Sequence, residues 1–249
     1  MSNLPHTRNL LLGALRPADL AAIQPHLRPV EFRRREVLIA ADDPIKLVYF
    51  PVAGLISEVA CLENGSGVEA AAIGREGVIG AVPALGSGHA LAEYIVQVAG
   101  SGYSMPVERF RAAIEEQPAL RAILYRHAEA VSAVSLQSLA CIAFHPVEAR
   151  LARWLLIARD SIGRDVLPLT QEFLAQMLGV QRTTVTLAAQ SLEGTGVIRY
   201  RRGNIEILDV SRLKQCSCHC YEQVRQRRER ALPEPRINGA PQPAYLAAH

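Results

Sequence analysis

The chain has 249 residues, of which 49% are hydrophobic and 20% are charged, and its formal net charge is +3. This length suffices for two domains with separate cores, and the composition is ordinary for a globular protein. No apolar stretch approaches the roughly 18 residues of a transmembrane helix, so no membrane span and no membrane partner are expected. Five cysteines, an odd number clustered late in the sequence, do not form a disulfide framework. The apolar run between Arg8 and Arg16 lacks a small-residue cleavage site, which favours a cytoplasmic protein.

The positive charge is concentrated in the C-terminal third. Residues 146–232 hold 14 basic and 9 acidic side chains, whereas the rest of the chain holds 13 and 15. A polyanion would bind in that third of the chain. A surplus of this size, taken alone, favours an ordinary solvated surface.

Short strands separated by turns are predicted between residues 27 and 108. The segments "EFRRREVLI", "LVYFPVAGLISEVA", "GVEAAAI" and "YIVQVAGSGYSM" are rich in Val, Ile and Tyr, and glycines separate them. Strands at this spacing are typical of a sandwich or barrel. The segment "RPADLAAIQPHL" predicts a short helix before them.

One long amphipathic helix is predicted from Pro118 to Ile142, where glycine and proline are absent after the first residue. One of its faces carries apolar and small polar side chains at heptad-like spacing: Leu120, Leu124, His127, Val131, Val134, Ser138 and Cys141. This face could pack on the chain's own barrel, or it could pair with a second copy of the helix. The pattern favours neither interpretation.

A winged helix-turn-helix is predicted after the break at His145-Pro146. "VEARLARWLLIARD" forms an amphipathic helix, and Thr170 can cap a following helix that Gly179 ends. The next helix spans residues 182–193, and "VIRYRRGNIEIL" forms two strands that turn at Gly203-Asn204. Helix, glycine turn, helix and hairpin in this order are the winged arrangement.

The second of these helices is the predicted DNA-reading element. Its N-terminal end carries short polar groups and one guanidinium, without a carboxylate: Gln181, Arg182, Thr183, Thr184 and Thr186. The positive end of the helix dipole favours approach to DNA there. On the wing, the flanking phosphates would be contacted by Arg199, Arg201 and Arg202. Either helix alone could belong to an ordinary helical hairpin, so the prediction depends on the combination.

The segments "VEARLARWLL" and "LTQEFLAQMLGVQRTTVTLAAQSLEGTGVIRY" resemble the DNA-binding domain of the Crp/Fnr regulators, and the resemblance extends loosely over residues 20–222. It implies an α+β fold: a jelly-roll β-barrel with an N-terminal helix (1–117), a dimerisation helix and hinge (118–145) and a winged helix-turn-helix (146–222). Residues 223–249 are expected to be a flexible tail. The resemblance favours the dimer interpretation of the long helix. It implies a homodimer on palindromic double-stranded DNA, with RNA polymerase as a further partner.

The resemblance also implies roles for single residues. Arg182 stands where the family reads guanine, and Thr170, Gln171 and Thr184 stand where it grips phosphate. Many members carry a glutamate where this chain has Thr183. A different operator sequence is therefore expected.

The motifs for the family's small-molecule effectors are absent. Ala81 follows Gly80 where cyclic-nucleotide binders carry a glutamate, and residues 77–108 contain no Arg or Lys to hold a phosphate. No cysteine precedes Cys61, which argues against the family's iron–sulfur mechanism. We expect no cyclic-nucleotide binding, no cofactor and an unknown effector or none. His89 alone offers no metal centre for catalysis, so an enzyme is not expected.

The run "CSCHCYE" raises the question of a metal. If the helix that begins near Asp209 continued through it, Cys216, His219 and Cys220 would share one face and Cys218 would point away. A three-ligand zinc site is then conceivable, but packing of small, soft side chains is favoured. The predicted function is a dimeric, sequence-specific transcription regulator. The alternative is a dimeric interaction module with weak, nonspecific DNA contact.

Overall fold

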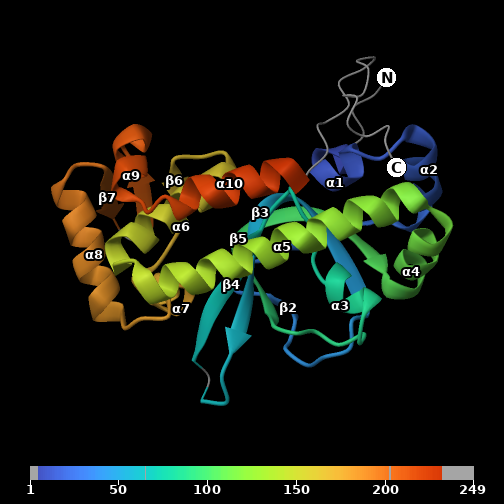
Figure 1. The fold of residues 1–249 in the computed structure, drawn as a ribbon, viewed down its shortest axis with the longest axis horizontal. Helices are drawn as coiled ribbons and strands as arrows, with labels where there is room; N and C mark the ends of the chain where they lie inside the picture. The colour runs from blue at the N-terminus through green and yellow to red at the C-terminus, as the bar shows by residue number, and fades with distance from the viewer. Residues whose placement is uncertain (1–4, 65, 202, 232–249) are drawn as a thin grey trace.

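The computed structural model describes residues 5–64, 66–201 and 203–231. A β-sheet domain and a helical domain lie at opposite ends of one long helix, α5 (Pro118–Phe144), which runs along the molecule (Figure 1). As expected, short helices precede the sheet: α1 (Leu10–Gly13) and α2 (Pro17–Ile23).

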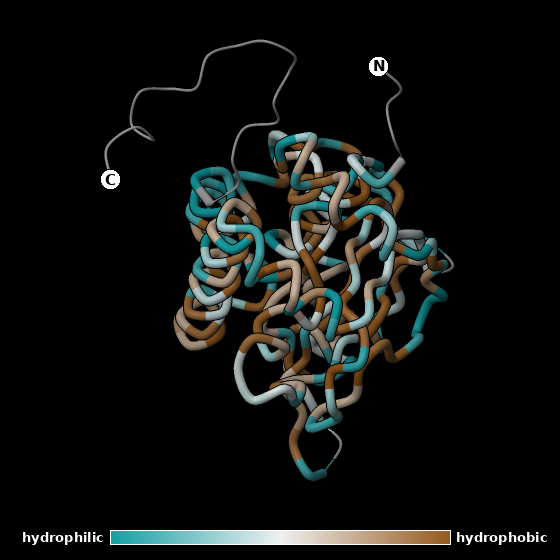
Figure 2. The backbone as a smooth tube through the Cα atoms, turned by 90° about the vertical axis from the view of Figure 1, so that its right-hand side faces the viewer, coloured by the Kyte–Doolittle hydropathy of each residue, from teal (hydrophilic) through white to brown (hydrophobic). Residues whose placement is uncertain are grey.

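The N-terminal domain is built on one antiparallel sheet of order β1-β5-β3-β4, with β2 also paired to β5. The strands are β1 (Arg28–Phe32), β2 (Val37–Ile39), β3 (Leu47–Cys61), β4 (Gly67–Ile73) and β5 (Glu93–Pro106). β3 and β5 are long and contain register shifts, which let a sheet curl around a core. The end of the β3–β4 hairpin projects from the body and is hydrophilic (Figure 2).

Helices α3 (Ala81–Leu85) and α4 (Val107–Glu116) complete this domain. Its core contains Phe32, Phe50 and Phe110, all almost fully buried, and it extends to the first turns of α5. The sheet domain therefore holds the N-terminal part of the long helix by burial of apolar side chains.

The helical domain begins with α6 (Val147–Ile162), followed by α7 (Gln171–Leu178) and α8 (Arg182–Gly194). A small sheet of order β6-β8-β7 follows, formed by β6 (Val166–Leu167), β7 (Ile198–Arg201) and β8 (Asn204–Ile207). The chain then forms α9 (Val210–Cys216) and α10 (Cys220–Ala231). This order confirms the winged helix-turn-helix.

The two domains share a hydrophobic core. Leu55, Val59 and Val98 of the sheet domain pack in one buried cluster with α6, α7 and α8. Trp154 of α6 donates a hydrogen bond of 2.8 Å to the carboxylate of Glu69 on β4. The helical domain is thus docked on the sheet.

The face of α5 expected to pair with a second copy points instead into the chain itself. Most of that set is buried within the chain: Leu120, Leu124, His127, Val134, Ser138 and Cys141, with Val131 partly buried. β4 and α10 pack against this face, which the sequence pattern could not distinguish from a dimer contact. Within this chain these side chains make intramolecular contacts, and their assignment to a dimer interface stays a prediction.

The opposite face of α5 is apolar and exposed. Tyr125, Leu136 and Leu139 lie on it, each about two-thirds exposed. In length and composition α5 is the one helix in the described part of the chain that could cross a membrane, contrary to our expectation, and 22% of its most apolar window is buried. The unusual hydropathy of α5 therefore comes from two apolar faces, of which the chain covers one.

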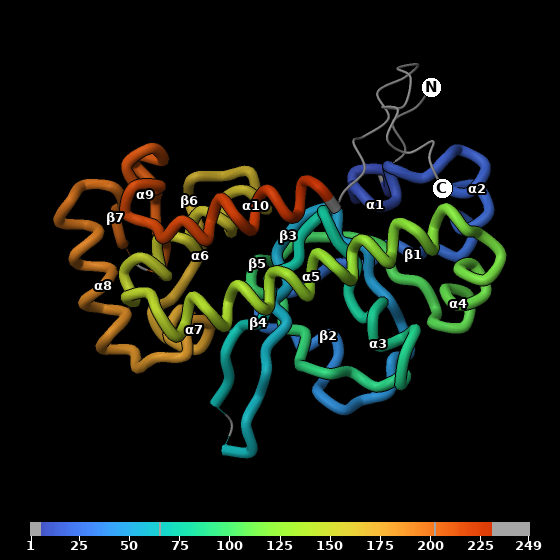
Figure 3. The backbone as a smooth tube through the Cα atoms, in the orientation of Figure 1, coloured from blue at the N-terminus to red at the C-terminus, as the bar shows by residue number. Residues whose placement is uncertain are grey.

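Helix α10 corrects the boundary expected for the tail. It returns antiparallel along α5 toward the sheet domain (Figure 3). Val224 is buried against Ala71 and Val134, so the ordered structure continues past residue 222 as far as Ala231. The remainder of the expected tail, residues 232–249, lies outside the described residues.

Candidate nucleic-acid interface

Local sequence signals set the geometry of α7 and α8. The Thr170 hydroxyl caps α7 by accepting a hydrogen bond from the Phe173 backbone N–H. Gly179 then adopts a left-handed conformation with φ of +63°, which permits the sharp turn into α8. The buried guanidinium of Arg150 on α6 donates a hydrogen bond to the Leu178 carbonyl and so ties this turn to α6. Arg150 was not among the predicted functional residues.

The N-terminal end of α8 faces solvent. Gln181, Arg182 and Thr183 are exposed, and Thr184 is partly exposed. No side chain caps this helix, so its first backbone N–H groups remain free to meet an anion. On the buried side Val185, Ala188, Ala189 and Leu192 anchor α8 in the core, as predicted. This end of α8 can therefore approach a nucleic acid without rearrangement.

Two predicted contact residues are tied to each other. The Thr186 hydroxyl donates to Gln171 Oε1 at 2.9 Å and lies 3.0 Å from the Arg182 carbonyl oxygen. This bond joins the start of α7 to the first turns of α8. Gln171 keeps its amide N–H₂ as a donor, which suits the phosphate contact implied for it.

The wing presents fewer free cations than the sequence indicates. Arg199 forms an ion pair of 3.0 Å with Glu206 on the neighbouring strand, whereas Arg201 is exposed. Arg202 lies outside the described residues. The Glu193 carboxylate accepts a hydrogen bond of 3.0 Å from the Tyr200 backbone N–H and so braces the wing against α8. This brace was not foreseen, because Glu193 resembles any exposed acidic residue at the end of a helix.

Known proteins share this arrangement. Residues 149–216 match the model of the Crp-like helix-turn-helix domain. A CRP-like cAMP-activated global transcriptional regulator of Mycobacterium tuberculosis is 25% identical over 82% of this chain and 94% of its own length. Residues 149–216 thus form a Crp-like helix-turn-helix domain, and over most of its length the chain is similar to a CRP-like transcription regulator.

Solved structures show the same fold. FixK2 from Bradyrhizobium japonicum aligns with a TM-score of 0.65 at 17% identity, over 77% of this chain and 98% of FixK2. A Crp/Fnr-family regulator from Eubacterium rectale aligns with a TM-score of 0.63 at 17% identity, over 83% and 96% of the two chains. These alignments confirm the predicted fold, with its sheet domain, long helix and helix-turn-helix.

The sheet domain contains a cavity of about 390 Å³ against α5. Its lining includes Gly80, Ala81 and Leu91 from the sheet domain and Ser132 and Ser135 from α5. None of the described lining residues is Arg or Lys. The ionisable lining groups include Glu58, whose pKa is raised by burial, and Tyr94, whose hydroxyl lies 3.4 Å from that carboxylate.

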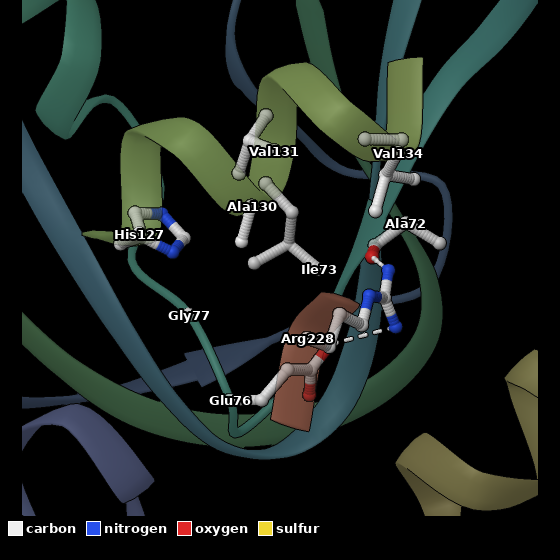
Figure 4. A pocket seen from close by; sticks show the side chains of 10 residues that line it. Ala72, Ile73, Glu76, Gly77, His127, Ala130, Val131, Val134 and Arg228 are labelled. Carbon is white, nitrogen blue, oxygen red and sulfur yellow. Dashed lines mark hydrogen bonds and ion pairs between the residues drawn. The ribbon is translucent and has the colours of Figure 1, made fainter. Parts of the chain in front are cut away.

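A smaller cavity of about 30 Å³ lies beside it, between β4, α5 and α10 (Figure 4). His127 lies at this cavity, and its Nε2 is 3.1 Å from the Val78 carbonyl oxygen. Burial lowers the pKa of His127 to about 4. Arg228 of α10 reaches into the same region and pairs with Glu76.

The cysteine-rich run is not one continuous helix. α9 ends at Cys216 and α10 begins at Cys220, so the side chains do not follow helical spacing through the run. Cys218 and Cys220 are buried against Cys141, as the packing interpretation expects. Of the candidate set of Cys216, His219 and Cys220, only Cys220 belongs to the group of sulfur and nitrogen atoms that converge here.

Proposed function

We propose that this protein is a homodimeric regulator of the Crp/Fnr family that reads a palindromic DNA site through α8. The observation that carries the proposal is the exposed end of α8, where Gln181, Arg182 and Thr183 surround free backbone N–H groups and no carboxylate intervenes. A guanidinium there can make two hydrogen bonds to the O6 and N7 atoms of guanine. The Thr183 side chain is shorter than glutamate and carries no charge, so it does not reproduce a carboxylate's contact with cytosine N4, and an operator different from those of glutamate-bearing members follows.

The outer face of α5 supports the homodimer. Leu136 and Leu139, 65% and 64% exposed, lie with Tyr125 on one stripe of this helix. Exposed apolar stripes of this kind mark protein contacts. A two-fold pairing of α5 helices would place the two copies of α8 to read two half-sites.

The large cavity supports an effector other than a cyclic nucleotide. A cyclic phosphodiester carries a negative charge, and burying it without a cation would cost several kcal/mol. The described residues that line the large cavity offer the Glu58 carboxylate and no arginine or lysine. We infer that an uncharged or cationic small molecule, or no effector, acts here, and that the protein works in the cytoplasm with RNA polymerase and without catalytic activity.

The test of the proposed function is selection of binding sites from random duplexes. The purified full chain is used without added effector and at physiological salt. A two-fold symmetric motif with half-sites about one helical turn apart is the expected result. Without enrichment, the selection is repeated with Thr183→Glu, which restores the residue of many relatives. Failure of both would refute sequence-specific reading by α8.

Salt dependence separates this proposal from a module with weak, nonspecific DNA contact. Specific binding keeps a large ratio of site to non-site affinity at physiological salt, because base contacts add to phosphate contacts. A merely basic surface would show equal affinities for both duplexes. Titration of the selected site and of a scrambled duplex at two salt concentrations measures that ratio.

A thermal shift assay with cyclic AMP tests the effector assignment. We expect no change in melting temperature with ligand concentration. Saturable stabilisation would show that the cavity accepts a phosphodiester, and it would overturn this part of the proposal.

A further inference from the structure

Cysteine and histidine side chains from two distant segments converge where α5 ends. Cys141 and His145 lie one helical turn apart at the C-terminal end of α5, whereas Cys218 lies in the break between α9 and α10 and Cys220 begins α10. Their three sulfur atoms and one ring nitrogen all lie within 4.8 Å of one another. Three of the side chains are buried, and His145 is partly buried.

Two of the distances between these atoms match a single tetrahedral ion. Around Zn²⁺, with bonds of about 2.3 Å to sulfur and about 2.1 Å to nitrogen, neighbouring ligand atoms lie about 3.5–3.8 Å apart. Cys141 Sγ lies 3.5 Å from Cys218 Sγ, and Cys220 Sγ lies 3.5 Å from His145 Nδ1. An iron–sulfur cluster would spread its ligands over several iron atoms, whereas these four atoms all lie within 4.8 Å of one another.

A second layer of polar contacts supports the same assignment. Gln137 Nε2 donates to Cys220 Sγ at 3.1 Å, and Gln137 Oε1 of the same side-chain amide accepts from Arg227 at 3.2 Å. The Arg227 bond fixes which end of the amide faces the sulfur. Donors oriented toward a ligand sulfur are typical of metal sites, where they stabilise the thiolate.

The surrounding charge includes two buried guanidinium groups, one of which, Arg153, also interacts electrostatically with the Glu69 carboxylate. Arg150 and Arg153 are buried on α6, close enough to interact electrostatically with Cys141. Within the described residues neither forms an ion pair with a carboxylate, and Arg153 Nε has no hydrogen-bond partner. Three thiolates and a neutral imidazole around Zn²⁺ carry a net charge of −1, which would compensate these guanidinium groups.

We propose that Cys141, His145, Cys218 and Cys220 bind one Zn²⁺ ion and that this ion clasps the C-terminal end of α5 to the junction of α9 and α10. All four ligand positions are filled by protein, so the site is structural. Each thiol that binds releases its proton to solvent. The ion links segments separated by more than 70 residues at the hinge that joins the dimer helix to the DNA-binding domain.

The consequence for DNA binding rests on the proposed function, but the metal binding does not. Because α6 starts at the same hinge, the clasp limits how the helix-turn-helix turns relative to α5. In a dimer this orientation sets the spacing of the two recognition helices. Metal loss should therefore weaken binding to the selected palindrome more than binding to nonspecific DNA.

The first experiment measures metal content in full-length protein without an affinity tag, purified under reducing conditions and desalted against a weak chelator. We expect one equivalent of zinc per chain in the wild type and background levels in Cys218→Ser and His145→Ala. The matched controls are Cys216→Ser and His219→Ala, which change the neighbours of these ligands in the same run and should keep the full equivalent. Zinc lost from the controls as well, or kept in Cys218→Ser, would overturn the assignment.

The second experiment removes the dependence on variants that could misfold. Zinc is extracted from the wild type, and Co²⁺ is titrated anaerobically while absorption is recorded. We expect the ligand-field bands of tetrahedral Co²⁺ with sulfur-to-cobalt charge transfer, saturating at one equivalent and displaced by Zn²⁺. Gln137→Ala should keep this spectrum and weaken Zn²⁺ affinity about 10- to 100-fold. An octahedral spectrum without charge transfer, or a Cys141–Cys218 disulfide that persists in reductant, would refute the site.

Discussion

Arg228 of α10 and Glu76 of the sheet domain lie 3.3 Å apart, Nη1 to Oε1, and Arg228 also donates a hydrogen bond of 2.6 Å to the Ala72 carbonyl (Figure 4). Their side chains are only 19% and 16% exposed. The pair therefore fastens the last described helix to the sheet in a partly desolvated place, where water screens the attraction weakly. Helix α10, which follows the DNA-binding domain in the chain, thus packs against the N-terminal sheet domain.

Removing this pair should destabilise the protein. Glu76→Gln leaves the Arg228 guanidinium partly buried without its carboxylate, and the free energy of unfolding should fall by about 1–3 kcal/mol. Chemical denaturation measures the change. Arg230→Ala, an exposed arginine of the same helix, is the control and should change stability by less than about 0.5 kcal/mol. Equal effects of the two substitutions would contradict a specific role of the pair.

The hydrogen bond from Trp154 to Glu69 should couple the two domains. Trp154→Phe removes a donor from a buried carboxylate and should cost about 1–3 kcal/mol, part of it from lost volume. Glu69→Leu in both backgrounds completes a double-mutant cycle that isolates the bond, because a glutamine would still offer an oxygen to accept it. We expect a coupling free energy of about 1 kcal/mol. Additive effects would mean that the indole acts by packing alone.

Acidic pH should weaken the fold through His127. Its pKa is lowered by burial from 6.5 to about 4, so in that interval the unfolded chain binds a proton that the folded chain does not. Stability should therefore fall as pH decreases from about 6.5 toward 4, by about 3 kcal/mol at most. Unfolding free energies of wild type and His127→Gln across this range test the assignment. The difference in unfolding free energy between the two proteins should shrink at low pH, because the variant has no imidazole to protonate on unfolding. A difference that stays constant with pH would contradict the role assigned to His127.

Two arginines should affect DNA binding differently. Arg182→Ala should cost about 1–3 kcal/mol per half-site on the selected palindrome and relax preference at one base position. Arg201→Ala, on the exposed wing, should weaken all sequences alike and reduce the salt slope by about 1. Binding isotherms on selected and scrambled duplexes separate these effects. Loss of specificity in Arg201→Ala rather than Arg182→Ala would reverse the roles assigned to helix and wing.

A charge on the outer face of α5 should separate the subunits. Leu136→Glu places a carboxylate in the middle of the proposed interface, which raises the dimer dissociation constant by at least tenfold and weakens binding to the palindrome. Analytical ultracentrifugation at several concentrations measures the dissociation constant. Leu62→Glu is a matched control, since Leu62 is 66% exposed against 65% for Leu136 but lies at the β3–β4 hairpin. A wild type that sediments as a monomer at all concentrations would contradict the dimer itself.

The DNA-binding helices could be predicted closely because their signals are local. Thr170 caps α7 and Gly179 ends it, and the apolar positions of α8 repeat with the helical period. A cap, a left-handed glycine and a periodic face act within a few residues, so one sequence displays them completely. The partners of Gln171 and Arg199 were not visible in this way, because both bonds cross between elements.

The sequence by itself determined that α5 is a long helix, but the tertiary structure decided which of its apolar faces is covered. Val134 and Cys141 are buried because β4 and α10 return to them, whereas Leu136 stays exposed. In the same way the residue types in "CSCHCYE" suggested a metal site. The break between α9 and α10 places Cys218 and Cys220, rather than Cys216 and His219, beside Cys141 and His145. The sequence shows which side chains are apolar and which can bind a metal. Which atoms each of them meets depends on chain segments far away in sequence, whose approach is settled only when the whole core packs.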